Sequence, residues 1–314
     1  MSVTAVFRLC SAIFFCEKDP GDILQPIETV VITGGDTISD RAFYRLASLK
    51  NVTLPDSLKE IGKSAFEGCV SLESVKIPDG VVRLGEKAFC GCPVLTKASI
   101  GNGVPEIEME TFKGCARLAE VTFGKSVKSI EEEAFFGCSA LTEAKFPDGI
   151  KSIGRQAFFG CAFLTEVKFP DRVKSIGQQA FYGCGRLKGL ALPDGLETIG
   201  EEAFGGCWSI EKAAIPRGVQ AIPFGAFWGC GSLAEAAISD GVRDIGVNAF
   251  RGCGSLKSVS LRESVTRIGK EAFGGCVSLT ELTLPKGCKA ERNAFPKGCK
   301  VKGRLRAFFS TLGK

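Results

Sequence analysis

The 314-residue sequence contains no histidine, which removes several classes of catalytic and metal site. Without imidazole, no Ser-His-Asp or Cys-His nucleophile system can be assembled, and the histidine ligands common in zinc and iron sites are missing. The sequence also has no phosphate-binding loop and no G-x-S-x-G motif. We therefore expect a non-enzymatic protein with no metal ion and no cofactor. An enzyme that relies on carboxylates, lysines or its two tyrosines is the less favoured alternative.

Strong net charge and long apolar runs are missing as well. Lysine and arginine total 40 and aspartate and glutamate 35, which gives a net charge of +5. Because a nucleic-acid-binding surface concentrates basic charge on one face, and here acidic residues interleave, we expect no nucleic-acid partner. Apolar residues make up 45% of the chain, enough to bury a core, but none of their runs is long enough to span a membrane.

Residues 1–27 do not follow the repeat described below. Their apolar stretch VTAVFRLCSAIFFC is short and is interrupted by Arg8. It lacks the basic first segment and the small-residue cleavage site of a secretory signal, and Phe15 before Cys16 suits no lipoprotein-type processing. Three interpretations stay open: a cap on the first rung, a degenerate or wrongly delimited export signal, and a peripheral membrane anchor.

What the sequence does contain is a repeat of 23 residues, carried by phenylalanine and cysteine. One phenylalanine recurs at that interval without exception, a last one follows after 22 residues, and a glycine precedes each cysteine of the second series. A phase kept for so long is the signature of a repeat architecture. The phenylalanines are Phe43, Phe66, Phe89, Phe112, Phe135, Phe158, Phe181, Phe204, Phe227, Phe250, Phe273 and Phe295; the cysteines are Cys69, Cys92, Cys115, Cys138, Cys161, Cys184, Cys207, Cys230, Cys253, Cys276 and Cys299.

One repeat, LTEAKFPDGIKSIGRQAFFGCAF from Leu141, shows how each segment is expected to fold. Ala144 and Phe146 alternate with polar residues, as in a short strand with one buried face. The PDG that begins at Pro147 is a turn sequence, and the RQAFFGC that ends at Cys161 predicts a tight helical or 3₁₀ turn. No single repeat is long enough to enclose its own apolar face, so neighbouring repeats must stack to bury it, as in a solenoid.

The pattern resembles the leucine-rich repeats of the BspA-like class, also called the Treponema pallidum type. Their repeat is similar to L-x-x-I-x-I-P-x-x-V-x-x-I-G-x-x-A-F-x-G-C-x-x, and the match runs from about residue 40 to residue 299. Departures are local: Leu46 stands at the first cysteine position, and Cys288 replaces an aliphatic residue after the last turn. The resemblance implies a curved leucine-rich-repeat solenoid of about 12 rungs over residues 28–299, with short parallel strands and helical or 3₁₀ turns.

Stacking in register places equivalent side chains of successive rungs one above another, about 4.8 Å apart. We expect the phenylalanines to fill the interior as a column, with a column of buried thiols beside it. In-register cysteines point the same way, so their Cβ atoms lie farther apart than a disulfide prefers. The absence of any C-x-x-C pair also argues against metal binding. The cysteine series is therefore interpreted as structural and reduced.

Solenoids usually bind through surfaces that sum one side chain from each rung, and two such columns lie on the expected strands. Small residues gather on the strand face at Ala191, Ala214 and Ala237, beside the charged residues at positions 143, 145, 166 and 168. A partner's backbone can approach this strip closely, or the small residues relieve crowding on a curved sheet. The second column is basic, at Lys128, Lys151 and Lys174. It either attracts an acidic glycan or protein face or is a solvated strand.

The third candidate column is aromatic and follows the A-F pair of each repeat. It contains Phe136, Phe159, Tyr182 and Trp228, with Gly205 between the last two. These positions lie outside the inward-facing pattern, and exposed aromatic residues are typical anchors of protein interfaces. The alternative is partial burial of each ring against the adjacent rung.

The C-terminal residues 300–314 are expected to form a short amphipathic helix. Leu305, Phe308, Phe309 and Leu312 recur at helical spacing in the stretch VKGRLRAFFSTLGK. Such a helix caps the last rung or, as the alternative, lies with its basic residues on an acidic membrane or partner.

The resemblance implies a recognition protein. Members of this class are commonly surface or secreted proteins of host-associated microbes, implicated in adhesion to host cells and to extracellular-matrix proteins, although the specificity of one member does not transfer with the fold. We expect a protein partner, a host extracellular-matrix or cell-surface protein, with membrane association only through the termini. The alternative is an intracellular or periplasmic scaffold for a partner of the same cell, located in the cytoplasm if residues 1–27 are no export signal.

Overall fold

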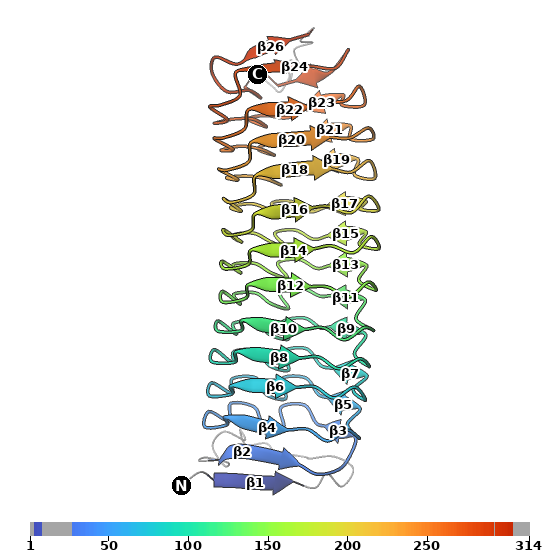
Figure 1. Cartoon of the computed structure of the whole chain (residues 1–314), viewed down its shortest axis with the longest axis vertical. Helices are drawn as coiled ribbons and strands as arrows, with labels where there is room; N and C mark the ends of the chain where they lie inside the picture. Colours follow the sequence, from blue (N-terminus) through green and yellow to red (C-terminus); the bar gives the residue numbers. More distant parts are fainter. Residues whose placement is uncertain (1–2, 8–26, 292, 304–314) are drawn as a thin grey trace, which may run out of the picture. The chain divides into compact units, whose positions relative to one another are not determined.

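The computed structural model describes residues 3–7, 27–291 and 293–303. The chain forms two compact units, Met1–Leu164 and Thr165–Lys314. Within each unit, short parallel strands are stacked rung upon rung and joined by turns (Figure 1).

Most rungs contribute a first strand of three or four residues and a second strand of two. The first unit contains β1 (Val3–Phe7), β2 (Ile27–Ile32), β3 (Thr37–Ile38), β4 (Asn51–Thr53), β5 (Glu60–Ile61), β6 (Ser74–Lys76), β7 (Arg83–Leu84), β8 (Lys97–Ser99), β9 (Glu106–Ile107), β10 (Glu120–Thr122), β11 (Ser129–Ile130), β12 (Glu143–Lys145) and β13 (Ser152–Ile153). The second unit contains β14 (Glu166–Lys168), β15 (Ser175–Ile176), β16 (Gly189–Ala191), β17 (Thr198–Ile199), β18 (Lys212–Ile215), β19 (Ala221–Ile222), β20 (Glu235–Ile238), β21 (Asp244–Ile245), β22 (Ser258–Ser260), β23 (Arg267–Ile268), β24 (Glu281–Thr283), β25 (Lys289–Ala290) and β26 (Lys300–Lys302).

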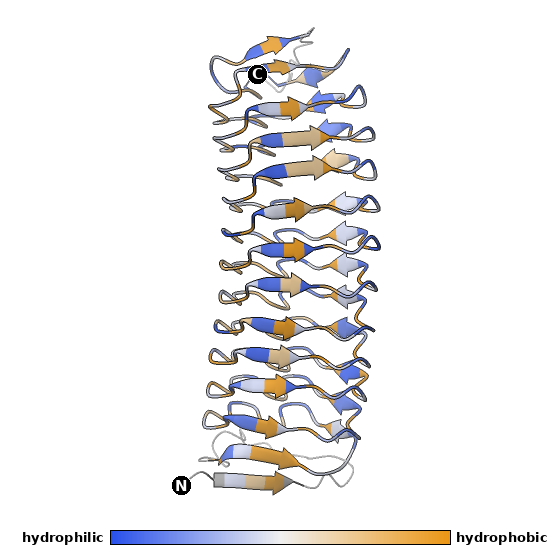
Figure 2. Ribbon diagram, in the orientation of Figure 1, coloured by the Kyte–Doolittle hydropathy of each residue, from blue (hydrophilic) through white to orange (hydrophobic). Residues whose placement is uncertain are grey.

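Strand pairing follows the 23-residue period of the sequence. Val75 of β6 faces Ala98 of β8, and Ala213 of β18 faces Ala236 of β20, each partner one repeat further along the chain. Along the first strands, inward apolar residues alternate with outward polar ones, an alternation that Figure 2 shows from rung to rung. The predicted leucine-rich-repeat solenoid of short parallel strands is thereby confirmed, while its curvature stays a prediction.

The segment after each second strand forms hydrogen-bonded turns. The carbonyl of Phe66 accepts the N–H of Cys69 at 3.2 Å, and the carbonyl of Cys69 accepts the N–H of Leu72 at 3.1 Å. Ser64 (φ 54°) and Gly68 (φ 75°) are left-handed, and they interrupt the run of right-handed residues that a helix requires. The described residues accordingly contain no helix, so these segments are turns and not the helical or 3₁₀ pieces expected from the sequence.

The recurring phenylalanines form the core of both units. Their rings are fully buried and stacked, with centroids 5.0 Å apart for Phe43 and Phe66 in the first unit and 5.4 Å apart for Phe204 and Phe227 in the second. The predicted phenylalanine column is therefore confirmed. Truncating a large core side chain of this kind costs about 3–5 kcal/mol in other proteins, so each ring is a major source of stability.

The cysteine column has a function that the sequence did not reveal. The thiol of Cys92 donates a hydrogen bond to the carbonyl of Phe66 at 3.3 Å, while the same carbonyl accepts the N–H of Cys69. Each phenylalanine carbonyl thus uses both of its lone pairs, one within its own rung and one toward the thiol of the next. The same S–H···O=C bond is made by Cys69, Cys115, Cys138, Cys161, Cys207, Cys230, Cys253 and Cys276.

Burial keeps the thiol of Cys69 protonated. It raises the pKa of Cys69 to about 12, because a thiolate in the apolar interior would lose its hydration. A reactive cysteine requires the opposite shift, and no disulfide forms among the described cysteines. The structural interpretation of the cysteine series is confirmed.

The strand ladders of the second unit are interrupted once at the same level on both sides. No strand pairing joins β16 to β18 or β17 to β19 among the described residues. Gly200 and Gly246 each donate an N–H to the isoleucine carbonyl of the preceding rung, at 2.8 and 2.7 Å. The equivalent residue between them is Pro223, which has no N–H to donate. This substitution accounts for the missing bond to Ile199.

Both ends of the described chain continue the strand stack. β1 pairs in parallel with β2, and β26 pairs in parallel with β24, so the strands reach Lys302, three residues beyond the predicted end of the solenoid. Residues 8–26, which hold most of the segment interpreted as a cap, export signal or anchor, lie outside the described residues. So do residues 304–314 of the expected C-terminal helix. Among the described residues, no helix is long and apolar enough to cross a membrane.

Candidate functional site

The strand face of the second unit presents the predicted strip of small residues. Ala191, Ala214 and Ala237 are all exposed, and Ala214 faces Ala237 directly on neighbouring strands. An ion pair between Lys212 and Glu235, 3.0 Å long, runs beside this alanine pair. The strip is therefore a flat surface without projecting side chains, edged by charge.

Two ion pairs join charged residues on the first strands, one pair in each unit. Glu143 and Lys145 lie 2.8 Å apart on β12, in the first unit, and Glu166 and Lys168 lie 3.3 Å apart on β14, in the second. All four side chains are well exposed, so each pair contributes little stability. Their value lies in the alternating charge that they present to a partner.

The basic column carries less available charge than the sequence implies. Lys128 and Lys151 of the first unit are exposed. Lys174 of the second unit is exposed too, but its ammonium group lies 2.9 Å from the carboxylate of Glu197. An acidic partner would have to displace that carboxylate, which makes the column a weaker candidate than its three lysines alone predict.

The surface aromatic residues of the first unit, Phe136 and Phe159, are packed against other side chains of that unit. Phe136 and Phe159 are half-buried and stack face to face, with ring centroids 4.8 Å apart and planes only 4° apart. The ammonium group of Lys113 lies over the Phe136 ring, 5.4 Å from its centroid, which is a cation–π contact. These two rings are therefore packed against their neighbours, as the alternative interpretation expected.

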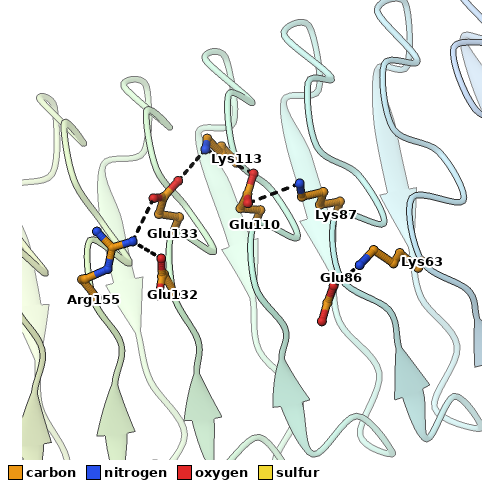
Figure 3. A network of polar contacts seen from close by, with 8 residues as sticks. All are labelled: Lys63, Glu86, Lys87, Glu110, Lys113, Glu132, Glu133 and Arg155. Atoms are coloured by element: carbon orange, nitrogen blue, oxygen red, sulfur yellow. Dashed lines mark hydrogen bonds and ion pairs between the residues drawn. The ribbon is translucent and has the colours of Figure 1, made fainter.

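A chain of ion pairs runs across the turns beside these rings (Figure 3). Glu110 bridges Lys87 at 3.4 Å and Lys113 at 3.1 Å, and Lys113 continues to Glu133, which Arg155 approaches at 3.6 Å. The side chains of Glu110 and Glu133 are only 17% and 15% exposed. The hydrogen bond to Glu133 raises the pKa of Lys113, and Glu110 adds to that effect. The turn face of the first unit is thus held together by its own charges.

The turn face of the second unit is built differently, around glycine. Tyr182 and Trp228 are two repeats apart, which corresponds to about 9.6 Å of stacked backbone, yet their ring centroids are only 6.3 Å apart. The rung between them has Gly205 at this position, and a Cβ there would lie 2.8 Å from Cδ2 of Tyr182. Because Gly205 has no side chain, the two rings lean together over its backbone.

Two exposed aromatic residues next to this pair were not among the predicted site residues. The Trp208 side chain lies against Gly185, within 3.3 Å of where a Cβ on that glycine would be, and it is 63% exposed. Phe224 is 41% exposed, at a turn position occupied by charged or polar residues in most other rungs. Trp228 itself is 40% exposed. Departure from the repeat consensus in the segment AIPFG is the signal that points to Phe224.

The carboxylate of Glu202 lies close to Tyr182 and Trp228, and Glu201 precedes it in the chain. Glu202 accepts a hydrogen bond from the amide of Gln179 at 2.6 Å. Burial raises the pKa of Tyr182, and the negative charge of Glu202 adds to that effect. Glu201 and Glu211 are exposed, and neither forms an ion pair among the described residues. We call Tyr182, Trp208, Phe224 and Trp228 together with Glu201 and Glu202 the aromatic–acidic patch.

Among the described residues, we find neither a cluster of metal ligands nor an activated cysteine nucleophile. Among them, no group of three or more cysteine, aspartate or glutamate side chains is arranged to hold a metal ion. The buried thiols of Cys69 and Cys161 have raised pKa values, whereas a nucleophile requires a lowered one. What the surface does offer is columns of equivalent side chains, an arrangement suited to binding another macromolecule.

A parallel solenoid built from leucine-rich repeats defines the class of this protein. The comparisons with known proteins then identify the family: the model described as BspA type Leucine rich repeat region (6 copies) matches over residues 36–163, 151–280 and 220–302. The chain belongs to this family, and the predicted resemblance is confirmed. Repeats of this kind form protein-interaction scaffolds that are typically non-enzymatic.

Solved structures with the same fold come from several bacteria. A leucine-rich repeat protein from Bacteroides ovatus is 26% identical with a TM-score of 0.74, and the match covers 95% of this chain and 92% of that one. A leucine rich cell surface protein from Faecalibacterium prausnitzii is 26% identical with a TM-score of 0.50, covering 87% and 80% of the two chains. A leucine-rich repeat protein from Eubacterium ventriosum shares the fold at 18% identity and a TM-score of 0.56, covering 98% and 93%. No curated protein matched the chain.

Proposed function

We propose that this repeat protein is an adhesin-like recognition protein, which binds a host extracellular-matrix or cell-surface protein without chemical reaction. The observation that carries the proposal is the exposed strip at Ala214 and Ala237, in register on β18 and β20 and edged by the Lys212–Glu235 ion pair. A strip without projecting side chains lets a partner's backbone approach closely, while the ion pair at its edge sets orientation.

Similarity to a cell surface protein supports a location outside the cell. The Faecalibacterium prausnitzii structure is described as a cell surface protein and is 26% identical to this chain. The buried, protonated thiols are compatible with that location, since their reduced state depends on burial and not on the redox compartment.

A binding experiment with purified protein tests the recognition function. The full chain is passed over a panel of immobilised extracellular-matrix proteins, alongside Ala214→Arg and the matched control Ala221→Arg, which puts the same side chain on the exposed position of β19. We expect binding to at least one member of the panel, lost with Ala214→Arg and kept with Ala221→Arg. Absence of binding to every member would contradict adhesion to the matrix.

A second experiment separates this proposal from its alternative, a scaffold inside the cell or in the periplasm. Intact cells that express the full chain are treated with a protease that does not enter them. Digestion of the protein supports the surface location. Full protection, with digestion only after lysis, would favour the scaffold.

A further inference from the structure

We propose that the aromatic–acidic patch of the second unit binds arginine side chains of an extended segment in the partner protein. This inference rests on the proposed recognition function and names the chemistry of what one face recognises. It concerns the turn face, which is distinct from the alanine strip on the strands.

The geometry of the patch suits a flat cationic group. Trp208 and Trp228 expose their indole rings to solvent, and the Trp228 ring is held in place by stacking on Tyr182. A guanidinium group is planar, is weakly hydrated and stacks on aromatic faces, most favourably on tryptophan. An arginine can therefore lie on these rings without losing much hydration.

The charge of the patch is complementary to that ligand. Glu201 is exposed and makes no ion pair among the described residues, and Glu202 is bound only to the neutral amide of Gln179. Both carboxylates stay available for the paired N–H groups of a guanidinium, which fit a carboxylate in a two-pronged arrangement. The combination of exposed indoles with unneutralised carboxylates favours arginine over an acidic, neutral or purely aliphatic segment.

The first unit provides the contrast that makes this patch specific. There the equivalent aromatic position is packed, and the cation over the ring of Phe136 is the chain's own Lys113. Glu133 is likewise neutralised by Lys113 and Arg155. The first unit thus fills internally the site that the second unit leaves for a partner.

Both tryptophans of the chain belong to the patch, so tryptophan fluorescence reports on it alone. The probe is a peptide without aromatic residues, in which arginines alternate with glycine and serine; the matched peptide carries neutral citrulline in place of arginine. We expect saturable quenching of the full chain by the arginine peptide, with affinity about tenfold higher than for the citrulline peptide.

Charge variants test the carboxylates. The double variant Glu201→Gln, Glu202→Gln is expected to lower the affinity for the arginine peptide about fivefold, since two charge-assisted contacts are weakened. The matched control Glu120→Gln, Glu143→Gln removes the same charge from the strand face and should leave the affinity unchanged. Equal binding of the two peptides, no quenching at all, or an equal loss in both double variants would overturn the inference.

The outcome is separable from that of the proposed function. A chain that binds the matrix panel but not the arginine peptide refutes the role of the patch and leaves adhesion standing. A chain that binds the peptide but no panel member keeps the patch and refutes adhesion to the matrix.

Discussion

The turn faces of the two units come from the same repeat, yet they present different chemistry. In the first unit, Glu110, Lys113 and Glu133 bridge successive rungs, and the aromatic rings beside them are packed. In the second unit the charged bridge is replaced by Gly205, leaning aromatic rings and unpaired carboxylates. A repeat architecture can therefore keep the same core in every rung, while the surface side chains of one region pair with each other and those of another region can contact a partner.

This difference lies only at positions that the core does not constrain. The buried phenylalanine and the thiol that donates to its carbonyl recur in both units with the same geometry. The position after the A-F pair faces outward and varies from Lys113 to Phe136 to Gly205 without disturbing the stack. The buried phenylalanine and cysteine columns thus provide stability, while the outward-facing column after the A-F pair is free to vary for recognition.

The largest expected effect concerns the shared core. Phe135→Ala in the first unit and Phe227→Ala in the second should each lower the free energy of unfolding by about 3–5 kcal/mol, because both rings are fully buried in equivalent stacks. Urea denaturation followed by circular dichroism measures both. A much smaller loss in one unit would show that the two cores differ, and the comparison would then extend beyond the surface.

A smaller effect is expected from filling the glycine position of the second turn face. Gly205→Ala puts a methyl group 2.8 Å from the Tyr182 ring, so the ring must move, at a cost of about 1–3 kcal/mol. The matched control is Gly189→Ala, whose added Cβ meets nothing within 4 Å. Denaturation midpoints give the cost. Equal midpoints for both variants would mean that the ring is not held over Gly205.

The ion-pair chain of the first unit predicts that replacing Lys113 lowers the free energy of unfolding by about 1 kcal/mol more than replacing Lys174 does. Lys113→Met leaves the largely buried Glu110 and Glu133 without their shared cation and removes the contact with Phe136. Lys174→Met breaks one exposed pair, with Glu197, and should cost close to nothing. Thermal unfolding at low and high salt compares them, and the Lys113 effect should shrink as salt screens it. Similar costs for both variants would contradict the distinction.

The smallest effect comes from the left-handed residue that precedes each A-F pair. Ser64 has φ 54° in the first unit, whereas the second unit has Gly225 with φ 59° at the equivalent position. Ser64→Gly should stabilise the fold by up to about 1 kcal/mol, because glycine removes the strain of a left-handed residue. Gly225→Ala should destabilise it by a similar amount. Ser64→Ala keeps the strain and is the control; a gain equal to that of Ser64→Gly would refute the backbone explanation.

The sequence was sufficient for the core and insufficient for the turn faces. One residue type at a fixed phase, such as Phe158 or Cys161, identifies the stack and its interior because every rung repeats the same constraint. The hydrogen bond from Cys92 to the Phe66 carbonyl was not foreseen, since it joins residues 26 apart and not one repeat apart. The left-handed residues that precede the A-F pairs were also missed, because all of them except Gly225 are residues other than glycine and carry no composition signal.

The candidate site was predicted only as separate columns. Tyr182 and Trp228 were identified as surface aromatics, but their contact across two rungs depends on the missing side chain of Gly205, which no pairwise pattern expresses. Trp208 belongs to another column, and the close approach of its ring to Gly185 depends equally on a missing side chain. The neutralisation of Lys174 by Glu197 depended equally on side-chain geometry.

Hydrogen–deuterium exchange of the full chain, with and without the arginine peptide, tests most directly where the arginine segment is recognised. The account predicts that slowed exchange is concentrated in the turns of residues 200–231, around Trp208 and Trp228, while residues 110–159 of the first turn face exchange at an unchanged rate. Protection confined to residues 110–159, or spread evenly over both units, would contradict it.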